Sequence, residues 1–197
     1  MIKLTRRAVT AGGLASLATA AFAAPQPYDL LTDRSSVTFT FLISGTAQTG
    51  RVPLSTADIR VDLRNLARST ARVTADVRRA RTGFAPVTQA LLSPSVLDAK
   101  THPTVLFSST GITLGARGRI SEGARIDGDL TLRGTTAPIR LDAVLSRPAG
   151  SAPDDLRELY IDLTGSLART NWGANGYPDL VDDEVRIDIH AEIRARA

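Results

Sequence analysis

The chain has 197 residues, 43% of them hydrophobic, with 24 basic and 20 acidic residues and no cysteine. A chain of this length can bury the core of a single domain without disulfides. The lack of cysteine excludes a disulfide framework, a thiolate nucleophile and a cysteine-ligated zinc site.

The first 23 residues have the features of an export signal. Three basic residues, Lys3, Arg6 and Arg7, precede a mild Ala/Gly/Leu/Thr run, and an Ala-Phe-Ala sequence ending at Ala23 offers a cleavage site. The paired arginines are typical of twin-arginine export, with general secretory export as the alternative. The run is short for a membrane span, so a retained anchor is less favoured. We predict a periplasmic protein whose single mature domain spans 24–197.

Removal of this signal changes the charge balance. The first 23 residues hold three basic residues and no acidic one, which leaves 21 basic against 20 acidic residues. The mature chain is therefore close to neutral, although the pI of the whole sequence is about 10.1. No basic stripe with interleaved aromatic residues is present, so we predict no nucleic-acid partner.

Alternation of apolar and polar residues with a period of two dominates the mature chain and predicts about eight strands. Each run has one apolar face and one charged or hydroxylated face, which is typical of antiparallel sheets. The runs are 36–43, 59–64, 73–78, 105–107, 126–133, 139–145, 159–167 and 185–194.

A single short helix is predicted over 87–92, ending before Pro94. The fold class is therefore all-β with one short helix. Antiparallel strands with one apolar face form either a sandwich or a closed barrel. Closure removes exposed strand edges, but periodicity alone does not distinguish the two.

The opening segment 28–39 and four later segments, in this order and spacing, resemble the YceI-like family of polyisoprenoid-binding proteins. The later segments are 93–110, 128–141, 169–173 and 180–187, and 128–141 is the strongest match. The resemblance extends from Tyr28 to the C-terminus. It implies a lipocalin-like antiparallel barrel of about eight strands that holds a long apolar chain.

The chain departs from the family pattern at several polar positions. Family members usually place histidines in the first strand region, where this chain has Arg34 and Ile43, and the family's polar helix motif is replaced by 87–91. These losses remove groups that could contact the head of a ligand such as an isoprenoid quinone. An apolar tail site is less affected.

The resemblance implies that inward-facing apolar residues bind the ligand. A chain threaded among them gains about 0.8 kcal/mol per buried CH₂ group. Periodicity alone favours an ordinary packed core for the same residues, and the resemblance favours the ligand site. The predicted ligand-binding residues are Val37, Phe39, Phe41, Leu91, Val105, Phe107, Leu130, Leu132, Ile161, Leu163, Trp172 and Ile187.

Trp172, the only tryptophan, lies in an expected loop at one barrel end. It either touches the ligand at the mouth or plugs the barrel, and the plug is the favoured interpretation. The acidic run 182–184 is more typical of a solvated turn than of a cation site.

Catalytic signatures are lacking. The chain has two histidines, His102 and His190, and no Gly-x-Ser-x-Gly elbow, His-x-x-x-His pair or glycine-rich phosphate loop. We predict a lipid-binding protein without enzymatic activity, metal or cofactor, as a monomer or homodimer. The resemblance also implies an alternative, a filled barrel that docks a membrane redox protein such as a b-type cytochrome. A lipid hydrolase is the third possibility.

Overall fold

Eleven strands form one antiparallel sheet in the computed structural model, which describes residues 25–115, 122–152 and 155–196. The export signal predicted for 1–23 lies outside these residues. The strands are β1 (Gln26–Leu30), β2 (Ser36–Ile43), β3 (Thr46–Val52), β4 (Leu54–Val61), β5 (Thr70–Asp76), β6 (Arg81–Thr82), β7 (Thr104–Leu114), β8 (Ala124–Leu132), β9 (Thr135–Ser146), β10 (Glu158–Ala168) and β11 (Glu184–Ala195).

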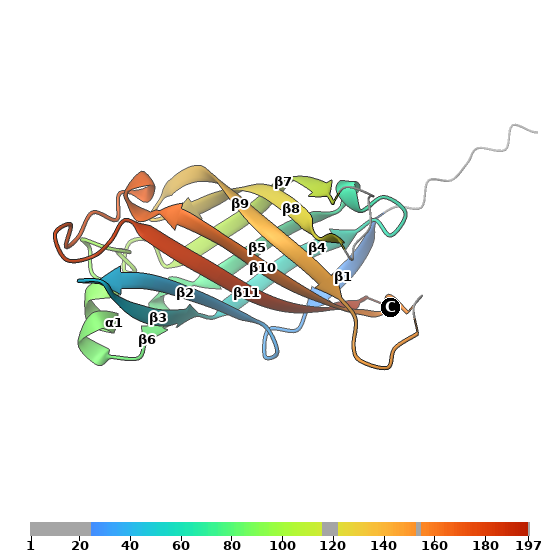
Figure 1. The fold of residues 1–197 in the computed structure, drawn as a ribbon, viewed down its shortest axis with the longest axis horizontal. Coiled ribbons are helices and arrows are strands. Elements are labelled where there is room, and N and C mark those ends of the chain that lie inside the picture. Colours follow the sequence, from blue (N-terminus) through green and yellow to red (C-terminus); the bar gives the residue numbers. More distant parts are fainter. Residues whose placement is uncertain (1–24, 116–121, 153–154, 197) are drawn as a thin grey trace, which may run out of the picture.

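Eight of these strands close into a barrel. The ring runs β1-β4-β5-β7-β8-β9-β10-β11, and β11 returns to β1 with Leu30 opposite Ile193. β2 pairs with another part of β11, with Val37 opposite Ile189, and extends the sheet through β3 to β6. Figure 1 shows the resulting elongated tube. The predicted antiparallel barrel is therefore confirmed.

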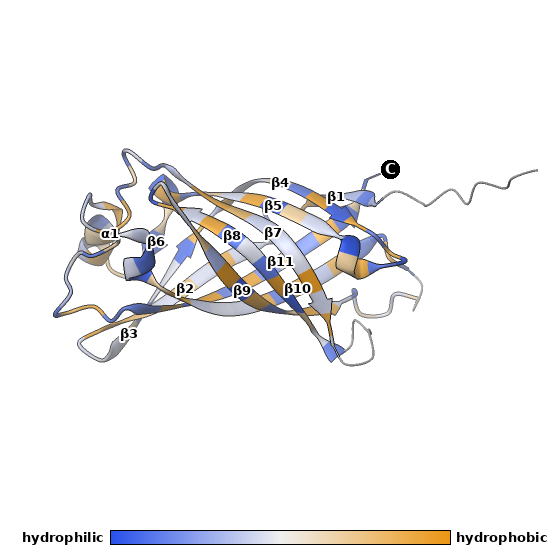
Figure 2. Ribbon diagram, turned by 90° about the horizontal axis from the view of Figure 1, so that it is seen from above, coloured by the Kyte–Doolittle hydropathy of each residue, from blue (hydrophilic) through white to orange (hydrophobic). Residues whose placement is uncertain are grey.

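The alternating apolar and polar residues of the strands face the inside and the outside of this tube, respectively. On β9, Ile139, Leu141 and Ala143 are buried, whereas Val144 between the inward positions is 55% exposed. The hydropathy colours alternate along the strands in the same way (Figure 2). Inward apolar residues leave water on closure, which provides the main driving force for folding.

One end of the barrel, where β1 lies, is filled by protein. Tyr28, Leu159 and Ile193 are almost completely buried in one cluster there. The Tyr28 hydroxyl donates a hydrogen bond of 2.7 Å to the carbonyl oxygen of Leu156. Because the phenol is both packed and bonded, this end is closed.

The opposite end is covered by α1 (Ala85–Leu92) and by the loop between β10 and β11 (Figure 1). The Thr82 amide donates to the Thr88 hydroxyl at 2.9 Å and so ties β6 to α1. The Gly176 amide donates to the Ser95 carbonyl at 2.8 Å and so ties the loop to the segment after α1. No helix in the described ranges has both the length and the apolar character needed to cross a bilayer.

Two differences from the predicted elements have local physical causes. β3 lacks apolar alternation because Gly50, an inward position, is covered by the ring of Phe39 on β2; a Cβ on Gly50 would lie 2.7 Å from Phe39 Cε2. β7 extends beyond 105–107, because a bulge between Ser109 and Gly111 interrupts its period.

The run predicted over 59–64 ends early. β4 stops at Val61, and Leu63 beyond it is 40% exposed rather than part of the core.

Candidate ligand-binding cavity

A cavity of about 470 Å³ lies inside the barrel, between the filled β1 end and α1. Such a volume is within the range of roughly 300–1,000 Å³ that is common for small-molecule sites. Its wall is apolar around the whole circumference, with contributions from strands of the ring, from β2 and from α1. Among the described residues that line it, Arg169 is the one with a charged side chain.

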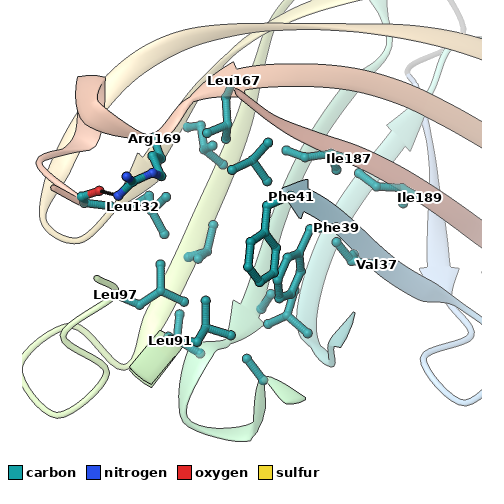
Figure 3. Close-up of a pocket in the computed structure, with 18 of the residues that line it drawn as sticks. Val37, Phe39, Phe41, Leu91, Leu97, Leu132, Leu167, Arg169, Ile187 and Ile189 are labelled. Carbon is teal, nitrogen blue, oxygen red and sulfur yellow. Dashed lines mark hydrogen bonds between the residues drawn. The ribbon is translucent and has the colours of Figure 1, made fainter. Parts of the chain in front are cut away.

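The close-up in Figure 3 shows how the wall is built. Phe39 and Phe41 from β2 stack with their ring centroids 6.1 Å apart and their planes at 20°. Ile187 and Ile189 of β11 lie next to them, because β11 pairs with β2. Leu91 of α1 comes from the covered end.

Eleven of the twelve residues predicted to bind the ligand lie on this wall. Their inward direction follows from strand parity, or for Leu91 from the inner side of α1. They are Val37, Phe39, Phe41, Leu91, Val105, Phe107, Leu130, Leu132, Ile161, Leu163 and Ile187.

Trp172 is the exception, because it does not line the cavity. It ends the short 3-10 helix η4 (Arg169–Trp172), is 2% exposed, and packs with Leu130, Ile139 and Leu141. Its indole N–H donates to the Leu130 carbonyl oxygen at 2.9 Å. This placement agrees with the plug interpretation and not with contact to a ligand in the cavity.

Small residues on the strands do not simply leave room for a guest. Gly128 is covered by the ring of Phe107, and Gly165 by the side chain of Leu141, so neighbouring side chains occupy the missing volume. Ala75 does line the cavity.

Arg169 organises the loop at the covered end. The residue is 6% exposed, and its guanidinium donates to four main-chain carbonyls, those of Ala174, Gly176, Val181 and Asp182. No carboxylate in the described ranges forms an ion pair with it. The guanidinium therefore satisfies carbonyls that the irregular loop leaves without sheet partners.

Several wall residues were not predicted. Val73 and Ile189 share the strand parity of the predicted set, so the same alternation identifies them. Leu97 and Tyr177 come from irregular segments, and Arg169 is a charged residue in an apolar wall. The local sequence carries no signal for these three, because their positions depend on tertiary contacts.

The titratable residues considered for catalysis lie elsewhere. His190 is on the outer face of β11, where Nδ1 lies 2.6 Å from Asp162 Oδ1 on β10. The hydrogen bond to Asp162 raises the pKa of His190. His102 packs against Gly134 in the β8–β9 turn. The described residues contain no cluster of three or more histidine, aspartate or glutamate residues arranged to hold a metal ion.

The acidic run 182–184 has a local structural role in part. Asp183 accepts hydrogen bonds from the amide and the hydroxyl of Thr170, both at 2.9 Å. This pair fixes the beginning of η4 against the start of β11.

Comparison with known proteins agrees with this architecture. The family model for the YceI-like domain matches residues 28–193. A UPF0312 protein of Vibrio vulnificus (strain YJ016) is 28% identical over 188 residues, which cover 93% of this chain and 97% of the relative.

Solved structures share the fold at low identity. BcnA of Burkholderia cenocepacia superimposes with a TM-score of 0.72 at 20% identity, over 83% of this chain and 99% of BcnA. A polyisoprenoid binding domain from Saccharophagus degradans gives a TM-score of 0.60 at 12% identity, over 87% of this chain and 99% of that domain. The Campylobacter jejuni YCEI protein gives 0.60 at 18% identity, over 75% and 85%.

Proposed function

We propose that this chain, which belongs to the YceI-like family, binds one long-chain apolar molecule in its barrel and carries or sequesters it. The ligand class is a polyisoprenoid or another long-chain amphiphile. The observation that carries this proposal is the cavity, because a space inside the barrel with an almost wholly apolar wall favours an apolar guest over water.

The volume of the cavity sets the size of the guest. A water molecule in the liquid occupies about 30 Å³, and a CH₂ group needs similar room. The cavity of about 470 Å³ then holds at least roughly 15 such groups, or about three isoprene units. A longer chain would have to project past α1, since the other end is filled by Tyr28, Leu159 and Ile193.

Burial of the apolar guest molecule supplies the binding energy. One five-carbon unit contributes about 3–4 kcal/mol gross, from which the cost of ordering the flexible chain is subtracted. No hydrogen bond to the tail is required.

We propose further that the protein acts in the periplasm and without catalysis. The export features of residues 1–23 support the first point, and N-terminal sequencing of the protein from its own host tests it. The position of His190 on the outer wall, away from the cavity, supports the absence of catalysis.

The cavity also favours the carrier over a filled barrel that docks a membrane cytochrome.

A matched pair of variants tests the proposal. Val73 lines the cavity and Val144 faces solvent on β9. We expect Val73→Trp to fill the cavity and weaken uptake of farnesol, a three-unit isoprenoid alcohol, at least about tenfold, with Val144→Trp binding as the wild type does. Unfolding midpoints verify that both variants fold, and Val37→Trp on β2, another strand of the cavity wall, repeats the test. Equal uptake by the filled and control variants would overturn the proposal.

A further inference from the structure

Exposed apolar and basic side chains lie together beside α1. Phe84, the residue before α1, is 60% exposed, the highest value among the exposed large hydrophobic residues of the described ranges. The Thr82 hydroxyl donates to its carbonyl oxygen at 3.0 Å, which fixes Phe84 next to β6. A single exposed phenylalanine is common on protein surfaces, so the significance of Phe84 depends on the charged residues of the neighbouring segments.

Three exposed arginines lie on β3, on β6 and on the helix just before β6. Arg51 of β3 stands directly opposite Arg81 of β6 in the antiparallel register, and both are exposed. Arg79 ends the short 3-10 helix η2 (Val77–Arg79) just before β6. We call Phe84, Arg51, Arg79 and Arg81 the basic rim.

None of the three arginines of the basic rim forms an ion pair within the described residues. Arg78 pairs with Asp76 at 3.1 Å. The hydrogen bond from Arg78, together with the nearby charge of Arg79, holds the pKa of the Asp76 carboxyl below its usual range. Arg81 instead donates to the carbonyl oxygens of Arg78 and Ala80. Like charges directly opposite on paired strands destabilise a sheet, so this arrangement favours an anionic partner.

The basic rim is continuous with the cavity through α1. Pro86, Val87, Ala90 and Leu91 line the cavity from the helix that Phe84 precedes. The acidic residues Asp179, Asp182 and Asp183 belong to the β10–β11 loop, which is bonded to β2 and to the segment after α1 and not to β6. The arginines at the α1 corner therefore favour the approach of an anionic surface there.

We propose that the basic rim docks on the surface of an anionic lipid bilayer. Phe84 enters the interfacial region, and the three arginines contact the lipid head groups. This contact places α1 against the bilayer, so that an apolar guest passes between membrane and cavity with little exposure to water. The inference goes beyond the carrier function, because docking needs no guest.

Binding to vesicles tests it directly. Vesicles of phosphatidylcholine, with or without phosphatidylglycerol, are incubated with the mature protein and separated by flotation. We expect binding to the mixed vesicles alone, decreasing as salt screens the charges. Phe84→Ser should weaken it about tenfold. Arg79→Ala combined with Arg81→Ala should weaken it about twenty-five-fold, at roughly fivefold for each arginine.

The opposite end of the barrel provides matched controls. Leu63→Ser removes an exposed leucine there, and Arg64→Ala removes a neighbouring exposed arginine. Both should leave vesicle binding unchanged. Absence of binding to mixed vesicles, or equal loss in rim and control variants, would overturn the docking proposal. Farnesol uptake is measured in parallel: uptake without vesicle binding refutes docking alone, and vesicle binding without uptake refutes the carrier function alone.

Discussion

The ring of Phe107 on β7 covers Gly128 on β8, and a Cβ at Gly128 would lie 2.6 Å from Phe107 Cζ. Phe107 lines the cavity. The glycine therefore determines where the ring lies, and the position of the ring limits the shape of the cavity.

Gly128→Ala should push the Phe107 ring toward the cavity. Overpacking of this kind costs about 1–3 kcal/mol of unfolding free energy, and the displaced ring should weaken farnesol uptake. Chemical denaturation and a binding titration measure the two effects. Gly111→Ala is the control, because a Cβ there meets nothing within 4 Å. A Gly128→Ala protein with unchanged stability and uptake would contradict this account of the wall.

Arg169→Met should loosen the loop that covers the cavity. The substitution leaves four carbonyl acceptors without their donor, at an expected total cost of about 3 kcal/mol. Hydrogen exchange should accelerate over 174–182, with little change on β9. Uniform exchange rates across both regions in the variant would show that Arg169 does not hold the loop.

Trp172→Phe tests the plug. The variant keeps an aromatic ring but loses the N–H bond to the buried Leu130 carbonyl, so we expect a loss of about 1–2 kcal/mol in unfolding free energy. Farnesol affinity should stay the same, because Trp172 does not line the cavity. A fall in affinity without a fall in stability would place the indole in contact with the ligand after all.

These residues also show which parts of the fold and of the cavity can be predicted from the sequence. Strand alternation predicted which residues face inward, because an inward direction follows from parity whenever the two faces differ in polarity. The resemblance to the YceI-like family was needed to predict a closed barrel with a ligand site. The contacts of Trp172 and Arg169 could not be predicted from the sequence, because both side chains bind main-chain carbonyls of segments that are irregular or distant in the chain. β3 was not predicted because it lacks apolar alternation. At its inward position Gly50, the ring of Phe39 from the neighbouring strand provides the apolar surface.

The pair His190–Asp162 predicts a small pH dependence of stability. The bond to Asp162 raises the pKa of His190 above its ordinary value of 6.5. The pair therefore makes its full contribution to stability at pH values below 6.5. This contribution is lost as the pH rises through the raised pKa of His190. Since the imidazole is 40% exposed, solvent screening limits the effect to about 0.5 kcal/mol or less.

NMR titration of the His190 ring checks this. In Asp162→Asn the pKa of His190 should fall toward the ordinary value. An unchanged His190 pKa in the variant would show that the hydrogen bond to Asp162 does not raise it.

The most direct test is a native mass spectrum of the protein purified from its own host without detergent. A carrier should show, beside the mass of the chain, a second species heavier by one long-chain apolar molecule, and extraction with organic solvent should abolish it. A spectrum of the bare chain alone, together with no uptake of farnesol or longer isoprenoid alcohols, would contradict the central claim that the barrel holds a guest.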